Sequence, residues 1–231
     1  YNNIKKIISH CGRLKKNEKS LILFDNKTQN IALDFSKIAK KITSRIELFK
    51  MKSEKVHGVE PENIVKKKMI NSDLIICLTT MSIIHTKARK VASKNGSRYL
   101  SLPFYDKKIL KNKAFNTNFE KLIPLSKKIK KILDKGNLIN VNTERGTNIN
   151  LNIKNRSANN APGICYKKGT VASPPDAEVN IAPVENAKGK IVVDGCIPIK
   201  QIEKLKKSNP LTLIISNGKI VKIHGKQKNI L

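Results

Sequence analysis

The chain has 231 residues, of which 39% are hydrophobic, and a formal net charge of +30. That length is enough for one large domain or two small ones. No apolar run approaches the ~20 residues that cross a bilayer, so we expect no membrane partner. The sequence starts at Tyr1 without Met or a signal-peptide pattern, so we expect a native start to be missing.

The strong positive charge has two interpretations. A basic surface attracts the phosphate backbone of nucleic acids, which keeps a basic nucleic-acid-binding protein as one hypothesis. Only six of the 47 basic residues are arginine, however, and Asn and Ile are abundant beside Lys. Arginine is the preferred residue for gripping phosphates and reading bases. We therefore favour a compositional bias toward AT-rich codons and predict no specific nucleic-acid partner.

The four cysteines are widely separated, at Cys11, Cys77, Cys165 and Cys196. None forms a Cys-x-x-Cys pair, and no His lies at zinc-finger spacing from them. Unpaired thiols of this kind are typical of a reduced compartment. The sequence therefore predicts a cytoplasmic protein.

The first part of the chain alternates between two hydrophobic periods. Apolar residues at helical spacing predict helices over 1–17, 29–41, a segment after Pro61, 82–95 and 117–134. Short continuous apolar runs predict buried strands at 20–24, 46–49, 73–79 and 98–102. Strand–helix alternation predicts a mostly parallel sheet wrapped by helices.

The pattern changes after Gly136. Apolar and polar residues alternate with period two in 138–143 and 148–154, which predicts half-exposed antiparallel strands. A loop is expected over 155–175, followed by strands at 178–183, 190–193, 211–215 and 219–224, the last two joined by an Asn217-Gly218 hairpin. The fold class predicted is α/β, with an α/β domain over 1–136 and the start of a β-rich, α+β catalytic domain over 137–231.

One polar cluster follows the clearest predicted strand. If the helix begins at Ser82, then Ser82, His85, Thr86 and Arg89 share one face of it. The carboxyl end of a parallel strand is where α/β sheets place ligands. We treat Ser82, His85 and Arg89 as candidate contacts, with a solvated helix face as the equal alternative.

Glu178 is the candidate metal ligand. It lies at the entrance of a predicted strand, between Pro175 and Pro183. A carboxylate in that position can ligate a divalent metal or act as a base. In isolation an ordinary exposed loop acid is the simpler interpretation, and no complete metal site is visible.

Taken together, these segments resemble the aminopeptidase T family of metallopeptidases, which is leucyl aminopeptidase-like. The resemblance rests on the order and spacing of several short pieces, chiefly 57–61, 73–76, 82–89, 96–98, 146–151, 155–156, 162–163, 175–185, 189–195 and 214–225. It runs over nearly the whole chain.

The resemblance implies a cytoplasmic metallo-aminopeptidase, a hydrolase that removes N-terminal residues from peptides and forms a homodimer. It implies two divalent metals, either Zn, Co or Mn, with Glu178 as one ligand, and substrate or dimer contacts at Ser82, His85 and Arg89. The family's other ligands lie further along than residue 231. We therefore expect this polypeptide, as given, to lack most of the metal site and to be inactive.

The same fold includes a ring-cleaving dioxygenase that acts on dihydroxypyridine with a single iron. A mononuclear iron dioxygenase is therefore the second hypothesis, because a shared fold does not determine the reaction.

Overall fold

The computed structural model describes residues 2–184, 186–197, 205 and 209–226. The chain divides into two compact units, the first being Tyr1–Lys127 with Asn160–Val179 and the second Lys128–Asn159 with Asn180–Leu231. Residues 160–179 thus belong to the first unit, although they follow a β-rich stretch in the sequence. The single domain boundary near residue 136 stays a prediction.

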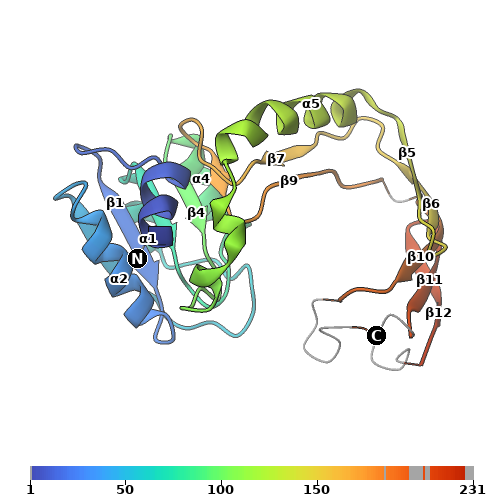
Figure 1. The fold of residues 1–231 in the computed structure, drawn as a ribbon, viewed down its shortest axis with the longest axis horizontal. Coiled ribbons are helices and arrows are strands. Elements are labelled where there is room, and N and C mark those ends of the chain that lie inside the picture. The colour runs from blue at the N-terminus through green and yellow to red at the C-terminus, as the bar shows by residue number, and fades with distance from the viewer. Residues whose placement is uncertain (1, 185, 198–204, 206–208, 227–231) are drawn as a thin grey trace. The chain divides into compact units, whose positions relative to one another are not determined.

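The first unit is built on a five-stranded parallel sheet with the strand order β2-β1-β3-β4-β8 (Figure 1). Its strands are β1 (Ser20–Phe24), β2 (Ile46–Lys50), β3 (Leu74–Cys77), β4 (Arg98–Ser101) and β8 (Val171–Ala172). Every residue of β1, β3 and β4 is buried. Continuous apolar runs form such strands because helices cover both faces of the sheet.

The two faces of this sheet pack against different helices. On one face, Ile22 and Ile76 lie in a core with α1 (Asn2–Lys6), the π-helical turn η1 (Ile7–Cys11) and α2 (Gln29–Ala39). Alternate strand residues point the other way, because side chains of a strand alternate between faces. These residues form a second core with α3 (Asn63–Ile70) and α4 (Lys87–Lys94); they are Leu21, Leu23, Ile75, Cys77 and Tyr99.

Beyond β4 the chain forms three 3₁₀ turns and then a longer helix. The turns are η2 (Ile109–Lys111), η3 (Lys113–Asn116) and η4 (Phe119–Lys121), and the helix is α5 (Leu122–Lys135). Phe115 and Phe119 are fully buried and anchor the turns on the core that contains α1 and α2. The described residues include no helix with the length and apolar character that a bilayer crossing requires.

The second unit contains an antiparallel sheet with the order β12-β11-β10-β6-β5. Its strands are β5 (Leu138–Asn142), β6 (Asn148–Asn152), β10 (Lys188–Val193), β11 (Leu211–Ser216) and β12 (Lys219–His224). Asn217 and Gly218 both have positive φ, +47° and +72°, as a tight hairpin turn between β11 and β12 requires. A separate two-stranded sheet pairs β7 (Asn159–Ala161) with β9 (Glu178–Asn180).

The predicted fold class is confirmed, since a parallel sheet wrapped by helices is followed by antiparallel strands. Two local predictions are wrong. The expected loop over 155–175 contains β7 and β8, and β8 pairs with the edge of β4. The helix expected from Ser82 begins only at Lys87, with Thr86 as its N-cap.

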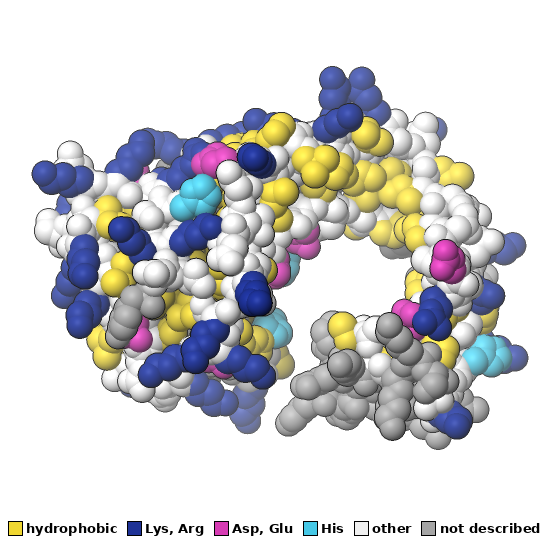
Figure 2. All heavy atoms as spheres, viewed as in Figure 1, with side chains coloured by type: hydrophobic (Ala, Val, Ile, Leu, Met, Phe, Trp, Pro, Cys, Tyr) yellow, Lys and Arg dark blue, Asp and Glu magenta, His cyan; other side chains and the backbone are white. Residues whose placement is uncertain are grey.

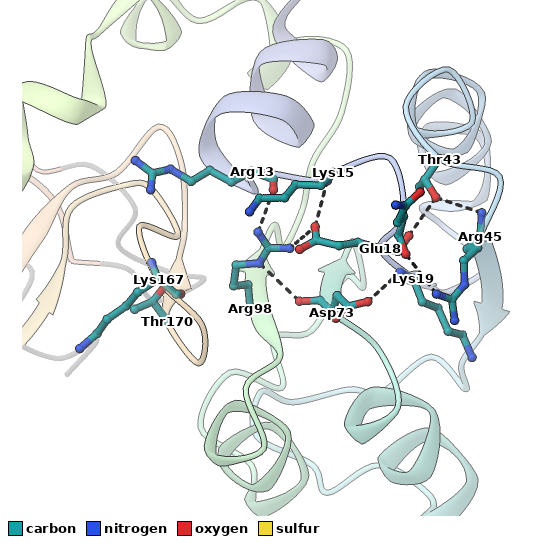
Figure 3. Close-up of polar contacts among 11 residues, drawn as sticks. Arg13, Lys15, Glu18, Lys19, Thr43, Arg45, Asp73, Arg98, Lys167 and Thr170 are labelled. Carbon is teal, nitrogen blue, oxygen red and sulfur yellow. Dashed lines mark hydrogen bonds and ion pairs between the residues drawn. The ribbon is translucent and has the colours of Figure 1, made fainter.

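A buried ion pair joins the amino ends of the central strands. The guanidinium of Arg98, at the start of β4, lies 2.5 Å from the carboxylate of Glu18, and their side chains are only 7% and 20% exposed. The same guanidinium donates to the carbonyl oxygens of Arg13 and Asp73 (Figure 3). Asp73, immediately before β3, accepts the Lys19 N–H on its carboxylate at 2.8 Å. One side chain therefore ties together three segments that meet at this edge of the sheet.

We expect Arg98→Met to lower the free energy of unfolding by about 3 kcal/mol, because it removes the charged partner of the largely buried Glu18 carboxylate and the guanidinium donor of the Arg13 carbonyl. Urea unfolding followed by circular dichroism measures this loss, since the chain has no Trp to report it. Arg145→Met is the control, because the Arg145–Asp194 pair is largely exposed and 3.4 Å apart, and its loss should cost under about 1 kcal/mol. Equal stability of Arg98→Met and the unmodified protein would show that the ion pair does not hold this edge.

Candidate functional site

A cleft of about 430 Å³ opens at the carboxyl ends of β3, β4 and β8, within the first unit. It is lined by Ser82, Ile84, Ser101, Pro103, Tyr105, Ile109, Asn112, Ser173, Pro174, Pro175 and Asp176. Its volume lies in the range of small-molecule sites. A larger, more open hollow of about 600 Å³ lies beside α1. We assign the candidate site to the cleft because the carboxyl edge of a parallel sheet is where ligands bind.

The walls of the cleft combine flat apolar surfaces with hydrogen-bonding groups. The hydroxyl oxygens of Ser82 and Ser101 lie 3.4 Å apart, one after β3 and the other at the end of β4. The Tyr105 hydroxyl donates to the Pro174 carbonyl, which joins the segment after β4 to the segment after β8. Burial, with the nearby Asp176 carboxylate adding to it, raises the pKa of Tyr105 well above its usual range. The phenol therefore stays neutral and keeps the O–H group that donates this hydrogen bond.

A buried carboxylate fixes the loop that leaves β3. Asp25, directly after β1, accepts hydrogen bonds from the Thr80 N–H at 2.6 Å, the Thr80 hydroxyl, the Thr28 hydroxyl and the Lys27 N–H. Burial by itself raises its pKa, but these four donors outweigh burial and hold the pKa of Asp25 below its usual value. Asp25 thus occupies the position between β1 and β3 where the strand order reverses.

The structure separates the three candidate contacts, Ser82, His85 and Arg89, which were predicted to share a helix face with Thr86. Ser82 lies in the cleft wall, where its hydroxyl accepts the Ile84 N–H at 3.2 Å. His85 is exposed in a turn before α4. Arg89 lies on α4, and its Nε donates to the Ile84 carbonyl at 2.5 Å. Burial lowers the pKa of Arg89. The shared face does not form because Thr86, not Ser82, accepts the N–H that caps the helix.

Glu178 is the first residue of β9 and its side chain is exposed. It follows Asp176, a residue of the cleft wall, by two positions. Among the described residues there is no group of three or more His, Cys, Asp and Glu side chains that could hold a metal ion. The structure therefore brings Ser82 and the segment before Glu178 to one cleft, but it supplies no complete ligand set there.

Several residues of the cleft escaped the sequence analysis. Tyr105 and Asn112 lie in a stretch where no regular element was expected, and nothing in their spacing indicated a role. Asp176, two positions before Glu178, had no signal of its own in the sequence. For Tyr105 the available signal was its position after the predicted strand β4, whereas Asp176 follows β8, a strand that the sequence did not predict.

Basic side chains are spread over the first unit instead of gathering around the cleft. Figure 2 shows Lys and Arg at many separate places on the visible face, and the cleft lining contains no Lys or Arg. The absence of a specific nucleic-acid partner and the homodimer both stay predictions.

Comparison with known proteins identifies the family. A family model described as 2,5-dihydroxypyridine 5,6-dioxygenase (NicX) matches residues 5–230. The chain belongs to the 2,5-dihydroxypyridine 5,6-dioxygenase family. Among curated proteins, none matches it.

Two solved structures share the fold of this family member. The 2,5-dihydroxypyridine dioxygenase of Pseudomonas putida KT2440 is 18% identical with a TM-score of 0.75, over 96% of this chain and 68% of the other. Wild-type AmpT from Thermus thermophilus is 10% identical with a TM-score of 0.64, over 99% and 72% of the two chains. At these identities the similarity shows the fold alone.

The family match corrects the main functional prediction. The assignments as an aminopeptidase, a hydrolase and a protease are wrong. The family gives no support to two Zn, Co or Mn ions. The resemblance reflected a fold that both solved structures share. The hypothesis of a ring-cleaving dioxygenase, kept as the alternative, agrees with the family.

We expect Asp25→Asn to lower the free energy of unfolding by about 1–3 kcal/mol at pH 7, because a buried acceptor loses its charge. A carboxylate with a lowered pKa stabilises the fold above its unfolded pKa of about 3.9, and this stabilisation is lost as pH falls through the folded value. The difference between the variant and the unmodified protein should therefore shrink between pH 5 and pH 3 in urea unfolding. Asp106→Asn, at an exposed carboxylate that accepts the Ile109 N–H, serves as the control. A constant difference at both pH values would contradict the assignment.

Proposed function

We propose that the protein containing this chain is a metal-dependent dioxygenase that opens the ring of a dihydroxylated pyridine. The observation that carries the proposal is the family match, which spans residues 5–230. The cleft at the carboxyl edge of the parallel sheet supports it independently, because its position and volume suit a small ligand.

The lining of the cleft matches the chemistry of such a substrate. A dihydroxypyridine is a flat ring that carries two hydroxyl groups and a ring nitrogen. Pro103, Pro174 and Pro175 offer apolar surfaces against which a ring can pack. The hydroxyl groups of Ser82 and Ser101 and the carboxylate of Asp176 can pair with the polar groups on the ring's edge. In this proposal these side chains bind and orient the ring, and Ser82 is the member that the sequence analysis had selected.

We propose iron as the metal and Glu178 as one of its ligands. Non-haem iron dioxygenases commonly hold the metal with two His and one carboxylate, and Glu178 would supply the carboxylate. The described residues do not complete such a set around it. A single carboxylate does not hold a catalytic metal. His85 and Arg89 remain proposed substrate or dimer contacts, with no role in lining the cleft.

Substrate consumption by metal-loaded protein tests the function. We expect protein expressed from its whole reading frame and loaded with Fe²⁺ to remove the ultraviolet absorbance of 2,5-dihydroxypyridine. Metal-free protein and protein loaded with Zn²⁺ should leave that absorbance unchanged, because Zn²⁺ has no redox chemistry. An unchanged spectrum with protein shown to contain iron would contradict the proposal.

Glu178→Ala tests the ligand. We expect the affinity for Fe²⁺ to fall by more than about tenfold, because loss of a direct ligand costs at least as much as loss of an outer-shell partner. Iron per polypeptide after dialysis measures this effect. Glu144→Ala, at an exposed carboxylate in the turn between β5 and β6, should retain normal iron. Normal iron content in Glu178→Ala would show that Glu178 is not a ligand.

A further inference from the structure

One histidine outside the cleft touches two of its walls. Nδ1 of His57 accepts the Ser82 N–H at 2.9 Å. The ring of His57 also packs edge-on against the ring of Phe104, with 5.7 Å between ring centroids. Ser82 lines the cleft after β3, and Phe104 lies between two lining residues, Pro103 and Tyr105, after β4. His57 therefore links the segments that follow two neighbouring strands.

The short segment that carries His57 is bonded to the Ser82 segment at further points. The Gly58 N–H donates to the Ser82 carbonyl at 2.8 Å, so Ser82 is held through both of its backbone groups. The two carboxylate oxygens of Glu60 accept the N–H groups of Lys87 and Ala88 at 2.8 and 2.6 Å. These groups belong to the first turn of α4, so its amino end is already occupied by a carboxylate. Residues 57–60 thus fix the whole path from the cleft wall into α4.

The second wall shows local strain. Phe104 has a φ of +58°, a conformation that a bulky side chain rarely adopts. Its side chain is about half exposed, so burial in the core does not explain this backbone conformation. Such strain persists only where surrounding contacts over-determine it, and it concentrates at ligand sites. The ring of Phe104 packs against the ring of His57.

We propose that His57 is a positioning residue for the substrate, which clamps the Ser82 wall and the Phe104 wall of the cleft at a fixed separation. This inference rests on the proposed function for the identity of the ligand, a dihydroxylated pyridine. Nδ1 accepts a hydrogen bond only when the ring is neutral and its proton is on Nε2. The clamp therefore needs both an acceptor at the Nδ1 position and a ring that reaches Phe104.

Two substitutions separate these requirements. In His57→Asn the amide oxygen lies at the same distance along the side chain as Nδ1, so it can accept the Ser82 N–H, although the ring contact is lost. In His57→Phe the ring contact with Phe104 is retained and the acceptor is lost. His57 is exposed, so neither variant is expected to disturb the core.

Hydrogen exchange of the Ser82 amide tests the clamp without any catalytic assay. We expect exchange to be about five- to tenfold faster in His57→Phe than in the unmodified protein, because the hydrogen bond that protects this amide is absent. In His57→Asn the protection should be largely restored. Equal protection in His57→Phe and the unmodified protein would overturn the proposal, whatever the protein's activity.

Steady-state kinetics test the role in binding. With 2,5-dihydroxypyridine as the probe, we expect His57→Phe to raise KM several-fold with little change in kcat, and His57→Asn to raise it less. An unchanged KM in His57→Phe, or a fall in kcat alone, would overturn the positioning role. Failure of the unmodified iron-loaded protein to turn over this substrate would instead count against the proposed function, because the exchange measurement still stands.

Discussion

The ion pair between Arg98 and Glu18 is the interaction on which the geometry of the cleft depends. It lies at the amino edge of the parallel sheet, where the same guanidinium also bonds the chain at Arg13 and Asp73. In a parallel sheet, strands that start in fixed register also end in fixed register. With Leu74 opposite Arg98, Cys77 is opposite Ser101 at the other edge. The residues that line the cleft are therefore aligned by an interaction at the opposite end of the strands.

The same argument explains why β8, although only two residues long, positions one wall of the cleft. Tyr99 and Leu100 pair with Val171 and Ala172, so Ser173 emerges beside Ser101 at the carboxyl edge. A slip of one residue would send every side chain of β8 to the other face of the sheet. The hydrogen bond from Tyr105 to Pro174 joins the two segments again just beyond the strands. The segment that leads to Glu178 is thus held at the cleft in two ways. Strand pairing joins β8 to β4, and the Tyr105 hydrogen bond joins Pro174 to the loop after β4.

Sequence patterns predicted the elements that depend on burial and missed those that depend on distant partners. β1, β3 and β4 were predictable because continuous apolar runs have few other stable environments. The start of α4 was not, because Glu60, some 27 positions earlier in the chain, binds its first N–H groups. β8 was missed because a strand of two residues is too short to show a hydrophobic period. In the site, Ser82 was found for a wrong reason, since the helix face that selected it does not exist, while Tyr105 and Asn112 gave no local signal.

The functional error has a physical origin. Strand order, turns and helix packing are shared by proteins that differ in reaction, so resemblance in scaffold residues identifies a fold. Hydrolysis and ring opening differ in the metal and in its ligands, and the sequence analysis offered only one candidate ligand, Glu178. The family match over residues 5–230 distinguished the dioxygenase family from the aminopeptidase family, which a resemblance in scaffold residues could not do.

Isotope labelling tests the central claim most directly. A dioxygenase places both atoms of O₂ in its product, whereas a hydrolase takes its oxygen from water. Turnover of 2,5-dihydroxypyridine by the iron-loaded protein under ¹⁸O₂, with the product analysed by mass spectrometry, should therefore yield a ring-opened product that carries two labelled oxygen atoms. A ring-opened product whose new oxygen comes only from water would contradict the account.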